Sequence, residues 1–189
     1  MSEDNINIHN RPNRSYELVD YDPDWSSRFN EIATNIAPLF GDNLISIEHV
    51  GSTAVPGMIA KPTIDVSVAV KDLTTVVSLY EAMKQLGFIS LGDFIQQDEP
   101  EEYFVLNGNS VDDRLANVHV MQIGNPEIEE MITVRDFLRS NKDAARDYVE
   151  QKKLLMKQYG QNDYNAYSKN KRSFLEQLKT DARNWKSRQ

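Results

Sequence analysis

The amino-acid sequence predicts an α+β fold, in which a mixed β-sheet is flanked by helices and followed by a C-terminal helical segment. Short apolar or alternating stretches recur up to about residue 124, which indicates strands. From residue 126 onward, apolar residues recur at helical spacing almost to the end of the chain. The 189 residues contain no internal repeat and no clear linker, so we expect one domain.

This domain is expected to span residues 15–189, with a sheet part at about 15–124 and a helical part at about 125–185. Residues 1–14 are polar and predict a mobile tail. Six strands are expected, at residues 17–19, 44–50, 62–70, 88–91, 103–106 and 116–123. An acidic connection at 98–102 precedes the fifth of them, and a turn-rich loop is expected at 107–114 before the sixth.

The first helix is expected to begin at Pro23, with Asp22 as its N-cap, and to end at Pro38 and Gly41. Four further helices are expected at residues 72–86, 126–140, 142–159 and 163–185. The last of these is amphipathic, which predicts that one of its faces packs against the rest of the domain.

The composition is ordinary for a soluble domain, with 40% hydrophobic and 26% charged residues. No stretch approaches the roughly 18 apolar residues of a membrane span, and the acidic N-terminus is unlike a signal peptide. The absence of cysteine excludes disulfides, thiol catalysis and Cys-ligated zinc. Together these features favour a cytoplasmic protein. A net charge of −8 argues against broad nucleic-acid binding, although clustered late Lys and Arg residues can form a local basic pocket.

The most informative stretch connects two apolar strands and carries a Gly-Ser pair followed by a Pro- and Gly-rich loop. Gly51 lets the backbone approach a phosphate closely, and Ser52 and Thr53 can donate hydrogen bonds to it. Lys61 in the loop is a further candidate phosphate contact. Asp65 on the second strand supplies a hard oxygen ligand for magnesium. This pattern is typical of nucleotidyltransferase folds, which hold a triphosphate beside a metal.

Two-metal nucleotidyl transfer requires several carboxylates near one another. Asp65 provides the first acid of an acid-x-acid pair on one strand face, but Ser67 stands at the second position. A neutral hydroxyl is a far weaker magnesium ligand, and Ser67 is instead a candidate substrate- or phosphate-binding residue. The third position falls on a later strand, where Asn117 and His119 share a face. Asp65 and His119 are therefore the candidate catalytic residues, and the same two residues are the candidate metal ligands.

Magnesium is the expected ion, with manganese or zinc as alternatives because histidine prefers softer metals. A site of Asp65, His119, His49 and Glu48 would suit a metal-dependent hydrolase. The other interpretation of His119 is a hydrogen-bonded core histidine. Glu48 and His49 point to opposite faces of their strand, so at most one lines the pocket. If His49 faces the core, its ring is expected to hold the loop that begins at Gly51.

Four cations in the helical part are candidate phosphate ligands. Arg135 and Arg139 lie one helical turn apart and can bind a phosphate together, although an Arg–Asp network on the helix face is the alternative. Lys152 and Lys171 lie on successive helices, each one turn after a tyrosine. The alternative for both lysines is a solvated helix surface.

The chain resembles the GrpB family of the nucleotidyltransferase superfamily, which includes DNA polymerase β. The resemblance covers nearly the whole chain and rests on these segments: Glu48–Gly57, Lys61-Pro62, Ile64-Asp65, Tyr21–Trp25, Val118–Val120 and Arg135–Arg139. It implies a polymerase β-like fold with a nucleotide or another phosphorylated small molecule as ligand. Ser67 also leaves open a catalytically degenerate sensor or regulatory module. Fusion of other family members to dephospho-CoA kinase connects that second interpretation with coenzyme A synthesis.

Overall fold

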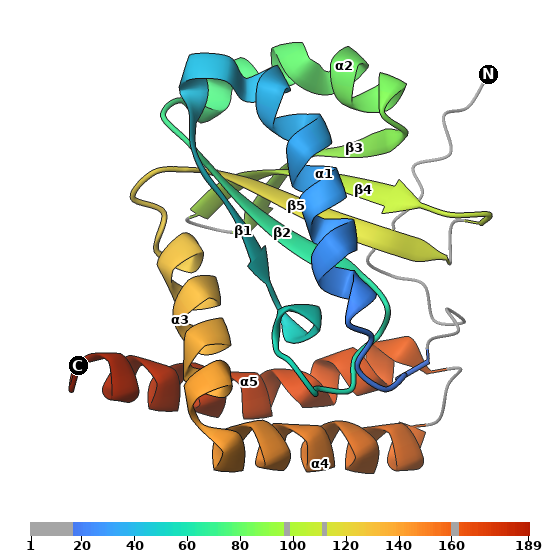
Figure 1. The fold of residues 1–189 in the computed structure, drawn as a ribbon, viewed down its shortest axis with the longest axis vertical. Helices are drawn as coiled ribbons and strands as arrows, with labels where there is room; N and C mark the ends of the chain where they lie inside the picture. The colour runs from blue at the N-terminus through green and yellow to red at the C-terminus, as the bar shows by residue number, and fades with distance from the viewer. Residues whose placement is uncertain (1–16, 97–98, 111–112, 160–162) are drawn as a thin grey trace.

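The computed structural model describes residues 17–96, 99–110, 113–159 and 163–189 (Figure 1). The tail predicted at residues 1–14 lies outside these ranges. The strands are β1 (Leu44–Val50), β2 (Ile64–Val70), β3 (Phe88–Gln96), β4 (Glu99–Asn107) and β5 (Arg114–Gln122). The α-helices are α1 (Asp24–Phe40), α2 (Tyr80–Gln85), α3 (Pro126–Ser140), α4 (Lys142–Tyr159) and α5 (Tyr164–Lys186). Three 3₁₀ turns join them: η1 (Gly41–Asn43), η2 (Ser52–Ala54) and η3 (Leu73–Leu79).

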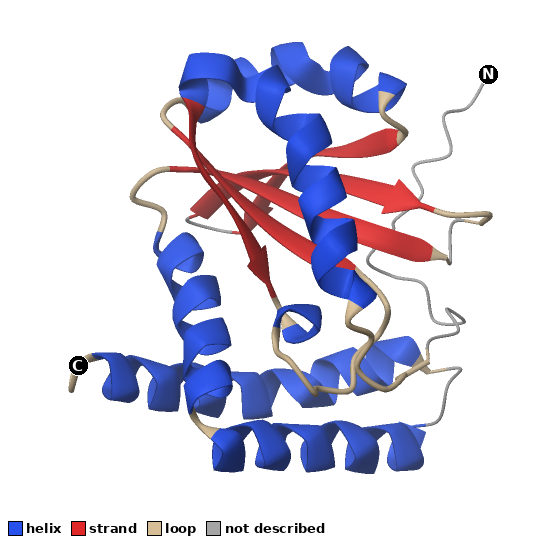
Figure 2. Ribbon diagram, in the orientation of Figure 1, coloured by secondary structure: helices blue, strands red, loops and turns tan. Residues whose placement is uncertain are grey.

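The centre of the molecule is a five-stranded mixed sheet with strand order β1-β2-β5-β4-β3. β2 and β5 are parallel, whereas the other neighbouring strands are antiparallel. Helix α1 crosses the sheet, and α3, α4 and α5 gather beyond one end of it (Figure 2). The predicted α+β fold is therefore confirmed. Among the residues that the structure describes, no helix is both long and apolar enough to cross a membrane.

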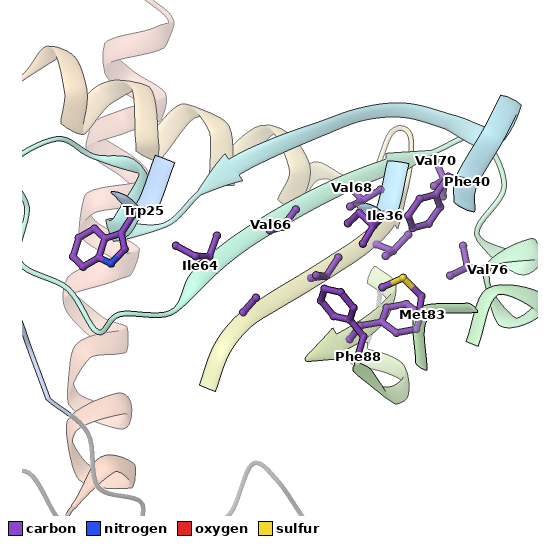
Figure 3. Packing of buried hydrophobic residues seen from close by; sticks show 14 of the residues in the cluster. Trp25, Ile36, Phe40, Ile64, Val66, Val68, Val70, Val76, Met83 and Phe88 are labelled. Carbon is purple, nitrogen blue, oxygen red and sulfur yellow. The ribbon is translucent and has the colours of Figure 1, made fainter. Parts of the chain in front are cut away.

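One face of the sheet forms the main hydrophobic core together with α1 and α2. The alternate β2 residues Ile64, Val66, Val68 and Val70 are at most 2% exposed on this face, where Trp25 of α1 also lies (Figure 3). Burial of each such side chain contributes about 1.5–3 kcal/mol. Since successive strand residues point to opposite faces, this core directs the intervening β2 residues toward the opposite face of the sheet.

A second apolar cluster joins the Pro- and Gly-rich loop to the C-terminal helices. Val55 and Met58 of the loop pack with Leu138 of α3, Tyr148 of α4 and Leu178 of α5. Helices α3 and α4 have the bounds that the sequence predicted, and Asp163 caps α5 by accepting a hydrogen bond from the Ala166 N–H. The loop that follows the Gly-Ser pair is thus held between the sheet and the helices.

The structure differs from the sequence prediction at the first strand and the first helix. The strand expected at 17–19 is only an isolated bridge between Val19 and Ala60. Helix α1 includes Pro38 and continues to Phe40. A proline inside a helix removes one backbone hydrogen bond, but burial of Phe40, which is 4% exposed, stabilises the final turn.

Later elements also differ from the prediction, and among them β3 extends to Gln96 and β5 begins at Arg114. The helix expected at 72–86 begins as the 3₁₀ turn η3, because successive β-branched residues disfavour α-helix after the Asp72 cap. The acidic segment predicted as a connection belongs in part to β4, which begins at Glu99. Glu101 and Glu102 are accommodated there because each has a partner, His119 and Tyr80 respectively.

Candidate functional site

The Gly-Ser turn packs directly against Asp65. Gly51 has φ 72° and ψ −168°, a backbone conformation that is nearly restricted to glycine. A Cβ atom at this position would lie 2.5 Å from Asp65 Oδ2. The turn between β1 and η2 therefore requires glycine for two reasons, its backbone angles and the closeness of the carboxylate.

Asp65 is held in place from the neighbouring strand β5. Asn117 Nδ2 donates a hydrogen bond of 2.7 Å to Asp65 Oδ1. Asn117 Oδ1 accepts one of 3.1 Å from Arg114, whose Nε donates to Asn107 Oδ1 at 2.9 Å. The parallel register of β2 and β5 creates this network, since it places Asp65 beside Asn117. Sequence reasoning missed Arg114 and Asn107, which lay in or next to a segment predicted as a loop.

The residues around Asp65 do not fit a pair of metal ions held by the protein alone. The second acid position is Ser67, which is 1% exposed and whose hydroxyl has no hydrogen-bond partner among the described residues. The third position, beside Asp65, is the neutral Asn117. In the part of the chain that the structure describes, no group of three or more His, Cys, Asp or Glu residues is arranged to hold a metal ion. Asp65 is thus suited at most to one cation shared with an anionic ligand.

Lys152 reaches the Gly-Ser turn from helix α4. Its Nζ donates to Ser52 Oγ at 2.7 Å and to the Ile59 carbonyl at 2.9 Å, and lies 4.3 Å from the centre of the Tyr148 ring. The side chain is only 2% exposed. Burial lowers the pKa of Lys152 well below its usual value, the positive charges of Lys171 and Lys61 lower it further, and Asp65 opposes them. A negative ligand at this position would therefore stabilise the charged ammonium form.

Two adjoining cavities meet at the turn. The first, called here the basic cavity, has a volume of about 200 Å³, and its wall includes Lys61, Lys152 and Lys171. The second, called the apolar cavity, has a volume of about 190 Å³ and lies between α3 and α5. Its apolar wall consists of Met131, Val134, Leu138, Tyr148 and Leu175. Because Ser52, Asp65 and Lys171 line both cavities, the carboxylate stands at their junction.

His49 lies on the core side of the sheet. Its ring stacks on Phe29 of α1, and its Nε2 is 3.0 Å from Thr53 Oγ1. His49 therefore holds the loop after Gly51, as the sequence suggested for a core-facing orientation. Burial lowers the pKa of His49 to about 4, while Asp65 opposes this change. The suggested metal set that included His49 is wrong, because this ring is on the opposite face from Asp65.

Arg135 and Arg139 do not form a joint phosphate clamp. Arg135 Nη1 donates to Glu48 Oε2 at 2.6 Å and to the His49 carbonyl at 3.0 Å. Arg139 Nε and Nη2 donate to the Ala54 carbonyl at 2.9 and 2.8 Å. Arg135 lines the apolar cavity, whereas Arg139 lines a separate surface cavity beside the loop. Both arginines connect α3 to the Gly-Ser turn, and a direct phosphate contact by either stays a prediction.

His119 has a different neighbour from the one expected. Its Nδ1 lies 3.0 Å from Glu101 Oε2 on β4, and strand pairing places Asn117, not His119, next to Asp65. Burial alone would lower the pKa of His119, but the hydrogen bond and the negative charge of Glu101 raise it above its usual value, with a smaller contribution from Asp65. The structure thus keeps His119 and Asp65 on one sheet face without joining them in a cluster.

The remaining predicted site residues differ in whether they line the two cavities. Thr53 is 3% exposed, and its hydroxyl is bonded to His49, so its side chain supports the loop. Ser52, Thr53, Lys61 and Lys171 line the basic cavity, whereas Ser67 lines neither cavity beside Asp65. The tertiary structure therefore gathers Gly51, Ser52, Asp65 and the lysines at one place, and it leaves Arg139 outside.

Comparison with known proteins identifies relatives along almost the whole chain. Residues 15–181 match the family model described as GrpB protein. The chain is 33% identical over 179 residues to the protein YqkA of Bacillus subtilis, covering 95% of this chain and 50% of that relative. It therefore spans only half the length of YqkA.

Solved structures agree with the fold. The crystal structure of the conserved protein GrpB from Enterococcus faecalis superposes with a TM-score of 0.80 at 28% identity, covering 89% of this chain and 99% of that one. The Cid1 poly(U) polymerase, solved with MgGTP bound, gives a TM-score of 0.52 at 12% identity, covering 74% of this chain and 44% of that one. The second likeness shows a nucleotidyltransferase-like fold alone. By its family match and its relatives, the chain belongs to the GrpB family.

Proposed function

We propose that this protein binds a nucleotide or another phosphorylated small molecule, with the phosphate in the basic cavity against the Gly-Ser turn. The observation that carries the proposal is the position of Lys152, whose buried amino group donates to Ser52 Oγ at 2.7 Å in the wall of that cavity. Two further lysines in the same wall add positive charge. A cavity of this kind stabilises phosphate oxygens on an otherwise acidic protein.

A single divalent cation fits this proposal as a companion of the ligand. Asp65 Oδ1 is engaged by Asn117, while Oδ2 faces the Gly51 turn at the junction of the two cavities. Asp65 would hold the cation together with the phosphate oxygens, and the ion would supply neutralisation of their charge. Magnesium suits this set of oxygen ligands better than zinc, and manganese can occupy the same kind of site.

Nucleotide binding without nucleotidyl transfer is the second candidate. It is favoured because neutral residues, Ser67 and Asn117, occupy the two positions where further carboxylates were expected. Ser67 is buried without a partner among the described residues, and Asn117 uses its amide to fix Asp65. Neither the Ser67 hydroxyl nor the Asn117 amide can replace a carboxylate as the ligand of a second divalent cation. A sensor or regulatory module needs only the affinity and selectivity of the cleft. The Asp65–His119 hydrolase alternative has less support, because His119 is paired with Glu101.

Calorimetric titration with ATP and with inorganic tripolyphosphate, each with and without magnesium, tests the proposal. Wild type should bind both, and Lys152→Met should weaken both by about tenfold or more, as expected for loss of a hydrogen bond between charged groups. Lys153→Met is the matched control, since the Lys153 side chain is 56% exposed and paired with Glu150. Lys171→Met provides a second test without removing the bond to Ser52.

The outcomes separate the candidates. Absence of binding by both probes, or equal losses in Lys152→Met and Lys153→Met, would show that the basic cavity is not a phosphate site. Binding that magnesium strengthens and Asp65→Asn weakens supports the shared cation. Incubation of a bound nucleoside triphosphate with magnesium, followed by chromatography, then distinguishes turnover from binding alone.

A further inference from the structure

A third cavity continues the row beyond the apolar cavity. It has a volume of about 190 Å³ and is called here the distal cavity. Glu127, Met131 and Lys179 line both it and the apolar cavity, and Glu101 and His119 lie in its far wall. The three cavities therefore follow one another along the face of the sheet that carries Asp65, from the lysines, past Asp65, to His119.

The chemistry changes along this row. The basic cavity has a cationic wall, and the apolar cavity is lined by side chains such as Met131, Val134 and Leu175. The distal cavity adds polar groups that do not line the apolar cavity, namely the Glu101 carboxylate, the His119 imidazole and the Asn125 side chain. A charged group at one end, an apolar middle and a polar far end describe the ligand that would match all three.

His119 is arranged to contact a ligand in the distal cavity. Its Nδ1 is engaged by Glu101 at 3.0 Å, which fixes the plane of the ring and leaves Nε2 on its other edge. The side chain is 19% exposed and lines the cavity wall. The carboxylate of Glu101 raises the pKa of His119 against the effect of burial.

Size supports one ligand across the row rather than three separate ones. Cavities that hold small molecules commonly measure about 300–1,000 Å³. Each of the three here is smaller than that, at about 190–200 Å³, but the row as a whole falls inside the range. Shared walls at Asp65 and at Lys179 connect the segments.

We propose that the cleft takes an extended phosphorylated molecule, whose distal end bears an amide or a heterocycle that hydrogen-bonds to His119. The phosphate lies in the basic cavity and the apolar mid-section passes Asp65 into the apolar cavity. This proposal rests on the proposed function for the position of the phosphate. It assigns His119 to recognition of the ligand's far end rather than to a metal.

Titrations with probes of increasing length test the proposal. Inorganic tripolyphosphate reaches only the basic cavity, whereas ATP and dephospho-coenzyme A extend beyond it. His119→Asn and the shape-conserving Glu101→Gln should weaken binding of the extended probe that fits best by about five- to tenfold, the effect of one lost hydrogen bond. Neither variant should change the affinity for tripolyphosphate.

Nuclear magnetic resonance of the imidazole groups gives a readout that does not depend on the variants. The chain contains three histidines, so the His119 signal can be assigned by its loss in His119→Asn. An extended probe should shift this signal, and tripolyphosphate should not. The proposal is wrong if neither extended probe binds more tightly than tripolyphosphate and the His119 signal never moves. Retained tripolyphosphate binding would then leave the proposed function standing, whereas its loss would remove both.

Discussion

Replacing Gly51 by alanine should destabilise the protein and displace Asp65. A residue other than glycine at φ 72° and ψ −168° costs about 1–3 kcal/mol in backbone strain. The new Cβ would also lie 2.5 Å from Asp65 Oδ2 and 3.2 Å from Asp65 Cβ, so the carboxylate must move. Movement breaks the hydrogen bond from Asn117, which as a bond to a charged group is worth about 1.5–3 kcal/mol.

The expected total loss is therefore about 2.5–6 kcal/mol, which for a chain of this size corresponds to a fall in Tm on the order of 10 °C. Urea unfolding followed by circular dichroism measures the free energy, and a thermal scan measures Tm. Gly57→Ala is the matched control, because Gly57 also has positive φ, 79°, but an added Cβ would meet nothing within 4 Å. The loss of stability in Gly57→Ala should come from backbone strain alone.

The difference in stability between Gly51→Ala and Gly57→Ala tests whether the contact with Asp65 adds to the backbone strain. Equal destabilisation by Gly51→Ala and Gly57→Ala would refute the contact with Asp65. In an Asp65→Ala background the extra cost of Gly51→Ala should shrink, because the nearest oxygen is absent. A cost that is unchanged in that background would point to backbone strain as the whole effect.

Two further predictions concern side chains that hold the turn. Arg135→Lys should destabilise the protein by about 2 kcal/mol, because a lysine cannot replace the separate hydrogen bonds of the guanidinium to Glu48, the His49 carbonyl and Asp136. The Arg135 side chain is only 10% exposed, so water cannot readily replace these bonds. Urea unfolding measures the loss, and a smaller loss than in the exposed control Lys153→Met would contradict the prediction. The stability of the protein should depend on pH through His49, because the pKa of this residue is about 4 in the folded protein, mainly through burial, and 6.5 in the unfolded chain. The unfolded chain then binds more protons between these values, so stability from this group is complete above pH 6.5 and falls as the pH drops toward 4. A plot of Tm against pH should be less steep for His49→Asn, and an unchanged slope would show that the ring does not titrate on unfolding.

The local sequence predicted much of the framework. Helices α3 and α4 have the predicted bounds, because local signals mark where they begin: Asn125 caps α3 before Pro126, and the Asn141 side chain accepts a hydrogen bond from the first turn of α4. The alternation in β2 correctly put Asp65 and Ser67 on the face away from the core. Helix η3–α2 was predicted less well, since the competition between α-helical and 3₁₀ geometry depends on small differences in free energy.

The partners of individual site residues could not be predicted from local patterns. Glu101 lay in a segment interpreted as a connection, yet the β4–β5 pairing places it within hydrogen-bond distance of His119. Arg114 reaches Asn117 because a strand begins where a loop was expected. Both contacts depend on strand register, which long-range pairing sets.

By itself, the sequence determined the α+β class, the Gly-Ser turn and the face on which Asp65 lies, because these follow from composition, glycine chemistry and the two-residue repeat of a strand. Only the tertiary structure decided that Lys152, 100 residues after Ser52, contacts its hydroxyl. It also placed His49 in the core and His119 beside Glu101. Such contacts arise when separate elements pack around a common core, where the position of each side chain depends on the packing of all its neighbours.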